Sequence, residues 1–218
     1  TVSDIATALS TAQRMRFIKN ITAPKAAGAF QSAWLGTGIP GAGAAPPAYT
    51  AGSGYTCDRT TVGALAQANG ATQNWLARLQ AAMTQPGVLF IADRLWNCAG
   101  MGFAATTYTV TTPGALPARI TDDGLGCELW VEQNVAAGSV TGTLTANYKN
   151  VADDAKAGVI ATLVSSPVIG QMQPVPLQAG DTGIRSLVSV VNGGSWTSGS
   201  WGMTILKNYA QIEIPGIG

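Results

Sequence analysis

Residues 127–135 read CELWVEQNV, and residues 139–148 read SVTGTLTANY. In both stretches apolar and polar side chains alternate, and a short Ala-Ala-Gly link separates them. Side chains of a β-strand point alternately to its two faces, so a period of two predicts strands with one buried and one solvated face. The pair therefore predicts an antiparallel sheet that covers a hydrophobic core on one side.

Strand patterns continue on both sides of this pair. Further short runs, rich in β-branched residues, lie at 88–95 (VLFIADRL), 105–112 (ATTYTVTT), 159–164, 184–191, 200–207 and 211–214. Turn sequences such as Asn192-Gly193-Gly194 separate them, and no repeat of fixed period is visible. About eight short strands of this kind predict an antiparallel β-sandwich or jelly roll over residues 88–218.

The first 87 residues predict a helical region with two helices and an extended arm. Over residues 3–16, apolar side chains recur on one face after Ser3 as N-cap: Ile5, Leu9, Ala12 and Met15. A similar spacing predicts a second helix over residues 60–83, which Pro86-Gly87 ends. Between the helices, residues 36–56 are dominated by Gly, Pro and Ala. This arm is either a strap across a neighbouring subunit or a plain linker.

Charged residues make up 11% of the 218 residues, against 46% that are hydrophobic. Soluble domains usually carry roughly 25% charged residues. So low a charge favours a subunit whose faces are covered by neighbours, although a secreted monomer can have a similar composition. Residues 1–94 carry seven basic and three acidic side chains, and residues 95–218 carry five and eight. That excess is too small for a nucleic-acid-binding face, and no specific nucleic acid is expected.

No run approaches the roughly 20 apolar residues that cross a bilayer. The first residues lack the charged-then-apolar order of a signal peptide, so no membrane partner is expected. The three cysteines, Cys57, Cys98 and Cys127, are widely spaced. They indicate reduced, packed thiols of a protein made in a reducing cytosol, with one bridged pair as the open alternative.

The chain contains no histidine. This excludes Ser-His-Asp and Cys-His nucleophilic systems and removes the commonest metal ligand. Three scattered cysteines do not complete a structural zinc site, which takes four Cys or His ligands. We therefore expect no cofactor, no metal and no catalytic residue, and the chain is predicted not to be an enzyme.

Paired carboxylates are the remaining route to catalysis, as in glycoside hydrolysis. Glu128 and Glu132 share a strand face, but strand rise separates them by about 13 Å, which is too far for a catalytic pair. The aspartate pairs at 122–123 and 153–154 lie in turn sequences, where Asp caps its own backbone. A calcium site of the 122–123 pair with Asp181 is the less favoured alternative, because the spacing fits no EF-hand loop.

Two of the six tryptophans, Trp196 and Trp201, stand in the run GGSWTSGSW (193–201). Exposed aromatic side chains on a loop stack on sugar rings or anchor an interface. The slightly favoured alternative is that both residues plug one end of the sandwich core. A carbohydrate-binding jelly roll that uses these two side chains is the hypothesis from a different functional class.

Residues 92–101 read ADRLWNCAGM, and residues 115–150 read ALPARITDDGLGCELWVEQNVAAGSVTGTLTANYKN. In these segments the sequence resembles a group of tailed-bacteriophage virion proteins. In that group a DRLW-type segment precedes an LPR-type turn, a Gly-containing strand entry and a strand similar to ELWVE. The resemblance covers residues 85–215 and implies a jelly-roll-like structural protein of the phage particle, with no catalytic residue to carry over.

From this resemblance we expect a capsid decoration or cement protein that stabilises the head shell. It would be made in the cytoplasm of the host bacterium and localised in the virion. A tail, collar or baseplate component is the alternative. The expected partners are the major capsid protein or other virion proteins, within a homo-oligomer for which a trimer is favoured. The residues expected at interfaces are Ile5, Leu9, Arg14, Arg16, Pro40, Pro46, Pro47, Tyr49, Trp196 and Trp201.

Overall fold

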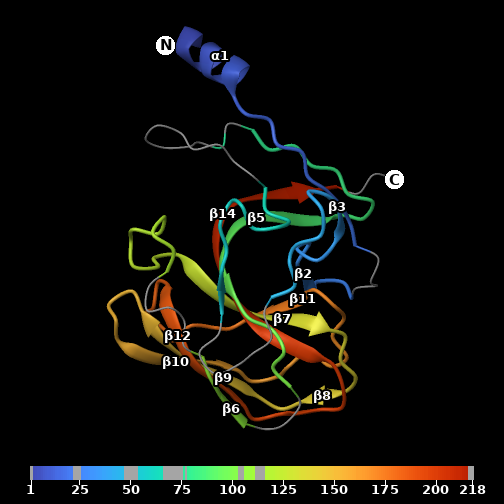
Figure 1. The fold of residues 1–218 in the computed structure, drawn as a ribbon, viewed down its shortest axis with the longest axis vertical. Coiled ribbons are helices and arrows are strands. Elements are labelled where there is room, and N and C mark those ends of the chain that lie inside the picture. The colour runs from blue at the N-terminus through green and yellow to red at the C-terminus, as the bar shows by residue number, and fades with distance from the viewer. Residues whose placement is uncertain are drawn as a thin grey trace.

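Two antiparallel β-sheets form the main body of the protein (Figure 1). The computed structural model describes residues 2–21, 26–46, 54–65, 76, 78–102, 106–110 and 116–215. One helix, α1 (Val2–Thr11), is present in this described part, and no helix there is long and apolar enough to span a bilayer. The chain is therefore mainly β, as its alternating segments predict.

The strands and their neighbours are as follows. The larger sheet has the order β2 (Phe30–Gln31), β11 (Gln171–Pro174), β7 (Cys127–Val135), β14 (Ser200–Ile214), β5 (Gly87–Asn97) and β4 (Tyr55–Thr56). The smaller sheet has the order β10 (Ala155–Ile160), β9 (Leu144–Asn150), β12 (Ile184–Asn192) and β6 (Thr106–Thr109). Two short ribbons pair β1 (Ile18–Asn20) with β3 (Thr37–Ile39), and β8 (Val140–Thr141) with β13 (Ser195–Trp196).

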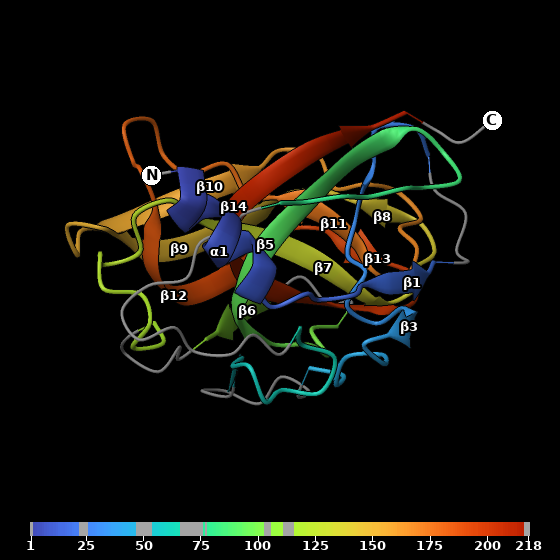
Figure 2. The same cartoon turned by 90° about the horizontal axis from the view of Figure 1, so that it is seen from above.

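The chain passes back and forth between the two sheets. From β5 to β14, successive long strands lie in opposite sheets, except for the β9–β10 hairpin within the smaller sheet. Seen from above, β5 and β14 run side by side over most of their length (Figure 2). The strands β11-β7-β14-β5 of the larger sheet face the strands β10-β9-β12-β6 of the smaller one. Because the chain changes sheet after almost every strand, most strands that pair within a sheet are distant in sequence.

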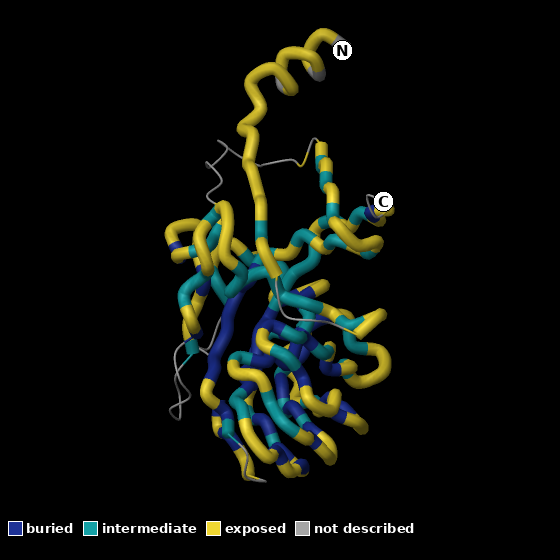
Figure 3. Tube along the Cα trace, turned by 90° about the vertical axis from the view of Figure 1, so that its right-hand side faces the viewer, coloured by how far each residue is buried: buried dark blue, intermediate teal, exposed yellow. Residues whose placement is uncertain are grey.

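One hydrophobic core fills the space between the sheets (Figure 3). The larger sheet contributes buried side chains of β7 and β14, and the smaller sheet those of β9 and β12; they include Leu129, Val131, Met203, Ile205, Leu144, Ala146, Tyr148, Leu187 and Val190. Strand β9 alternates buried and half-buried residues along its whole length. This is the period of two that predicted a sheet with one buried face.

Part of the outer face of the larger sheet is covered by the segment around Trp34, and the edge strands β2 and β4 extend the sheet on its two sides. Phe30 packs edge-on against Trp130, the Trp34 ring lies against the Arg94 guanidinium, and the Cys57 amide donates to the Leu95 carbonyl. Glu132, on the face of β7 that was predicted to be wet, is therefore buried. The described parts of the Gly/Pro-rich arm, residues 36–46 and 54–56, contact their own chain. Residues 37–39 pair with β1, Gly43 and Ala44 bond to Trp34, and Tyr55–Thr56 pair with β5.

Several strand boundaries differ from the sequence-based prediction. Residues 200–207 and 211–214 form one strand, β14, because bulges between 205 and 206 and between 208 and 210 absorb the break in the pattern. The strand predicted at 159–164 lies earlier, at β10. Strand β11 was not predicted, because its sequence, QMQP, has neither alternation nor β-branched residues.

The prediction of a second helix over residues 60–83 is wrong for the described residues in that range, 60–65, 76 and 78–83, which are not helical. Gly63 has φ +89°, and a Cβ there would meet the Gly43 Cα at 2.3 Å. The Ala44 amide also donates to the Val62 carbonyl. Close backbone contact with the arm therefore overrides the helical spacing.

Helix α1 ends at Thr11, earlier than the predicted residue 16. The hydroxyls of Ser10 and Thr11 both donate to the Thr7 carbonyl, at 2.8 and 3.1 Å. Such side-chain bonds compete with the backbone bonds that would extend a helix. Residues 12–17 then lead without regular structure into β1.

Candidate interaction surface

The N-terminal projection, defined as residues 2–18, stands away from the two sheets (Figure 3). Every side chain described between Ser3 and Ile18 is exposed. They include four large apolar groups with 43–49% exposure: Leu9, Met15, Phe17 and Ile18. These four side chains therefore meet water in the isolated protein.

The base of the projection is held by the β1–β3 ribbon. The Lys19 ammonium donates to the carbonyls of Gly36 and Gly41, each at 2.9 Å. Partial burial lowers the pKa of Lys19. Gly38, at φ +143°, faces the Ile18 carbonyl so closely that a Cβ would lie 1.8 Å from its oxygen. The ribbon therefore fixes where the projection leaves the body.

A buried ion pair lies under the cover of the larger sheet. Arg94 of β5 donates to the Glu132 carboxylate of β7, and the two side chains are 8% and 1% exposed. The Thr204 hydroxyl of β14 donates to the same carboxylate at 2.9 Å. Burial alone would raise the pKa of Glu132, but the Arg94 charge and the hydrogen bonds that the carboxylate accepts lower it below the usual range.

We call the four residues Arg94, Glu132, Thr204 and Asn97 the clasp. With its amide oxygen turned toward Arg94, Asn97 accepts from Nη2 at 2.8 Å and from Nε at 2.6 Å. The Trp34 ring centroid lies 5.1 Å from the guanidinium. A carboxylate that is buried, ionised and shielded from solvent suits a structural role and not proton transfer.

The other carboxylates considered as site candidates are engaged by neighbouring side chains of their own chain. Glu128 accepts from the Trp130 indole at 3.0 Å and from Asn208 at 2.9 Å. Asp122 pairs with Lys207, whose hydrogen bond lowers the pKa of that carboxyl. Asp181 accepts from Tyr148 and Asn150, while burial and this carboxylate raise the pKa of Tyr148 to about 12. No three His, Cys, Asp or Glu groups gather closely enough for a metal ion among the described residues.

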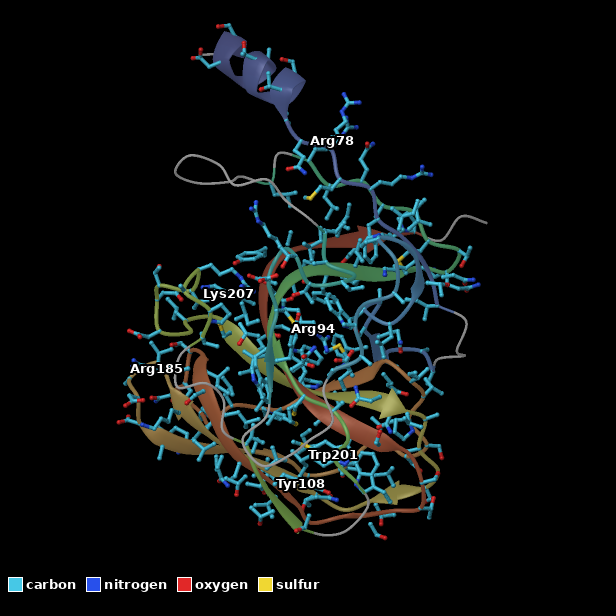
Figure 4. The ribbon with its side chains drawn as sticks, in the orientation of Figure 1. Arg78, Arg94, Tyr108, Arg185, Trp201 and Lys207 are labelled. Atoms are coloured by element: carbon cyan, nitrogen blue, oxygen red, sulfur yellow. The ribbon has the colours of Figure 1, made fainter. Side chains whose placement is uncertain are left out.

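Trp196 and Trp201 are core residues, so their assignment to an interface is wrong. Their exposures are 5% and 0%, and their rings stack with centroids 5.5 Å apart. Tyr108 meets Trp201 edge-on at 5.6 Å, as the lower end of Figure 4 shows. Gly199 adopts φ +91°, a turn that lets both indoles point inward. The alternative that they plug one end of the sandwich is confirmed.

The remaining predicted interface residues lie in different settings. Arg14 and Arg16 are exposed on the projection with Leu9, whereas Pro40 is half-buried after a cis peptide bond and Pro46 is buried. Pro47, Tyr49 and the side chain of Ile5 lie outside the described residues. The structure therefore brings together only the N-terminal members of the predicted set.

The three cysteines are free and buried, as their spacing predicted. Burial raises the pKa of Cys57 and Cys127 to about 11 and that of Cys98 to about 12. These thiols are packing groups without nucleophilic character at neutral pH. A pocket of about 20 Å³ between Val131, Leu163 and Trp196 is large enough for one water molecule at most.

No family model, curated protein or solved structure matches the chain.

The distribution of ion pairs was not predictable from the sequence. Each cation from Arg94 onward contacts a carboxylate: Arg94–Glu132, Arg119–Asp93, Lys149–Asp153, Lys156–Asp154, Arg185–Asp123 and Lys207–Asp122. Four exposed cations earlier in the chain have no carboxylate partner among the described residues: Arg14, Arg16, Arg59 and Arg78. Uncompensated positive charge is therefore confined to the N-terminal third of the described chain.

Proposed function

We propose that this chain is a non-enzymatic jelly-roll subunit of a tailed-phage virion, and that it decorates and stabilises the head shell. The observation that carries the proposal is the strand order. The order β5-β14-β7-β11 opposite β6-β12-β9-β10, with the chain crossing between sheets, is the pairing order of a double Greek key. Jelly rolls of this kind recur in viral capsid proteins and in lectins.

The resemblance of residues 92–101 and 115–150 to virion proteins favours the first of these uses. The lectin alternative rested on Trp196 and Trp201, and both side chains are buried in the core. Buried indoles do not stack on sugar rings, so the carbohydrate-binding hypothesis loses its proposed site.

The N-terminal projection supports a role in assembly. The exposed apolar side chains of this projection, Leu9, Met15, Phe17 and Ile18, fit a subunit that buries them against another protein. The proposed partner is the major capsid protein or another virion protein, with this chain as a homo-oligomer for which a trimer is favoured. Many copies on a lattice allow modest contacts to sum into strong attachment.

The test compares phage particles with and without the protein. Release of packaged DNA on heating or osmotic shock is followed by a fluorescent dye, and purified protein is added back to particles that lack it. We expect earlier release without the protein and recovery on addition. Particles that are complete and equally robust without it would refute the stabilising role, and antibody labelling confined to the tail or one vertex would favour the tail, collar or baseplate alternative.

A further inference from the structure

We infer that the N-terminal projection binds an acidic surface of a different protein, with its arginines facing carboxylates and its apolar side chains packed between them. Basic and apolar residues alternate directly in the exposed segment Arg14, Met15, Arg16, Phe17. Arg78 lies at the same end of the molecule as α1 (Figure 4). The inference rests on the proposed function for the identity of the partner, which is then the head shell.

The charge distribution indicates what the partner must supply. Arg14, Arg16 and Arg78 are exposed and have no carboxylate contact in the described chain. Interfaces place potentials of opposite sign against one another, because like charges in contact cost several kcal/mol. A complementary surface therefore presents Asp or Glu side chains beside apolar groups.

A second copy of this chain fits that description poorly. Six of its carboxylates are already neutralised by the cations of its own body. Asp58, Glu128 and Asp181 each accept hydrogen bonds from neighbouring side chains. A hydrogen bond does not cancel the charge of a carboxylate, so these three and the exposed Glu213 stay acidic, but they come from four separate segments. No three acidic groups gather closely enough to share a cation in the described part of the chain. A second copy therefore offers scattered carboxylates and no acidic cluster, which favours a different protein.

The interleaved apolar groups also separate this surface from a nucleic-acid footprint. A chain that binds phosphates uses clustered cations with polar neighbours, and its affinity comes from counterion release. Here Met15, Phe17 and Ile18 are each more than 40% exposed beside the arginines. Burying them against a protein adds an apolar contribution that salt does not screen.

Cosedimentation with purified shells that lack this protein tests the inference. The test variant reverses two charges of the projection, Arg14→Glu with Arg16→Glu, and a second variant, Met15→Ser with Phe17→Ser, removes apolar groups. The matched control, Lys149→Glu with Lys156→Glu, makes the same change in net charge on the smaller sheet. All replaced side chains of the projection are exposed, so circular dichroism and the thermal midpoint check that each variant folds like the wild type.

We expect wild type and control to bind equally, the charge-reversed variant to bind roughly tenfold or more weakly, and the apolar variant to lose affinity even at high salt. Equal binding by the charge-reversed variant would overturn the inference and leave the proposed function intact. Failure of the wild type to bind any shell would overturn the proposed function, and the inference with it. If the wild type binds naked DNA as well as it binds shells, and the charge-reversed variant loses both, the partner is nucleic acid and not an acidic protein. If the charge-reversed variant loses only self-association, the partner is a second copy of this chain.

Discussion

Removing the Arg94 guanidinium is the sharpest test of how the cover is held on the larger sheet. Arg94→Met keeps most of the side-chain volume but leaves Glu132 as a carboxylate that is 1% exposed, with the Thr204 hydroxyl as its hydrogen-bond donor. Removing one partner of a buried ion pair costs about 3–5 kcal/mol, and losing the contact with Trp34 adds about 0.5–1 kcal/mol. We expect the free energy of unfolding at neutral pH to fall by about 3–6 kcal/mol.

Urea unfolding followed by tryptophan fluorescence measures this loss, as a shift in midpoint at unchanged slope. The matched variants are Glu132→Gln and the double variant Arg94→Met with Glu132→Gln. The double variant leaves no charge in the clasp, so it should be more stable than Arg94→Met alone. The reasoning is refuted if Arg94→Met lowers the free energy of unfolding by about 1 kcal/mol or less. It is also refuted if adding Glu132→Gln to Arg94→Met restores none of the lost stability.

The same pair predicts a pH dependence with a defined sign. Because the folded pKa of Glu132 is lowered, the stabilisation by its charged form is present above the ordinary carboxyl pKa and is lost as pH falls through the folded pKa. In Arg94→Met, burial penalises the charged carboxylate of Glu132 with no guanidinium to offset the penalty, so protonation of Glu132 at lower pH restores part of the variant's stability. The stability gap between wild type and Arg94→Met should therefore narrow between neutral pH and about pH 4. A constant gap would contradict the assignment.

Three further predictions follow from the described packing. Gly202→Ala would place a Cβ 1.8 Å from the Cys98 carbonyl oxygen, so we expect a loss of at least about 2 kcal/mol in thermal unfolding, and a neutral variant would contradict the close approach. The three buried thiols, with pKa values of about 11 to 12, should resist Ellman's reagent at about pH 8 until denaturant is added. Deleting residues 2–17 should change the free energy of unfolding by about 0.5 kcal/mol or less; a larger loss would place the projection on the body.

The strand segments were predictable because their pattern is local. The alternation at 127–135 depends only on which face of the strand meets the core, and the apolar, β-branched run at 184–191 is equally local. Both strands form within a residue of the predicted bounds. The clasp was not predictable in this way. Glu132 has the spacing of a solvated strand residue, but it is buried beside Arg94, whose guanidinium lies against the Trp34 ring from a segment far earlier in the chain.

The N-terminal third shows why local spacing was insufficient there. The apolar spacing over 60–83 is typical of a helix, but Gly63 packs against Gly43 of the arm and no helix forms in the described residues. Trp196 and Trp201 stand among Gly and Ser, a composition that fits an exposed loop and a buried turn equally well. In both cases the local structure is set by contacts between residues distant in sequence, which the pattern of a single segment does not predict.

The measurement that tests the proposed function most directly is the ratio of this chain to the major capsid protein in purified virions. Quantitative mass spectrometry with isotope-labelled peptides of both chains gives that ratio. For a head decoration protein we predict a fixed ratio, set by the symmetry of the shell and unchanged by further purification. Absence of the chain from purified particles that are infectious would contradict a structural role in the virion.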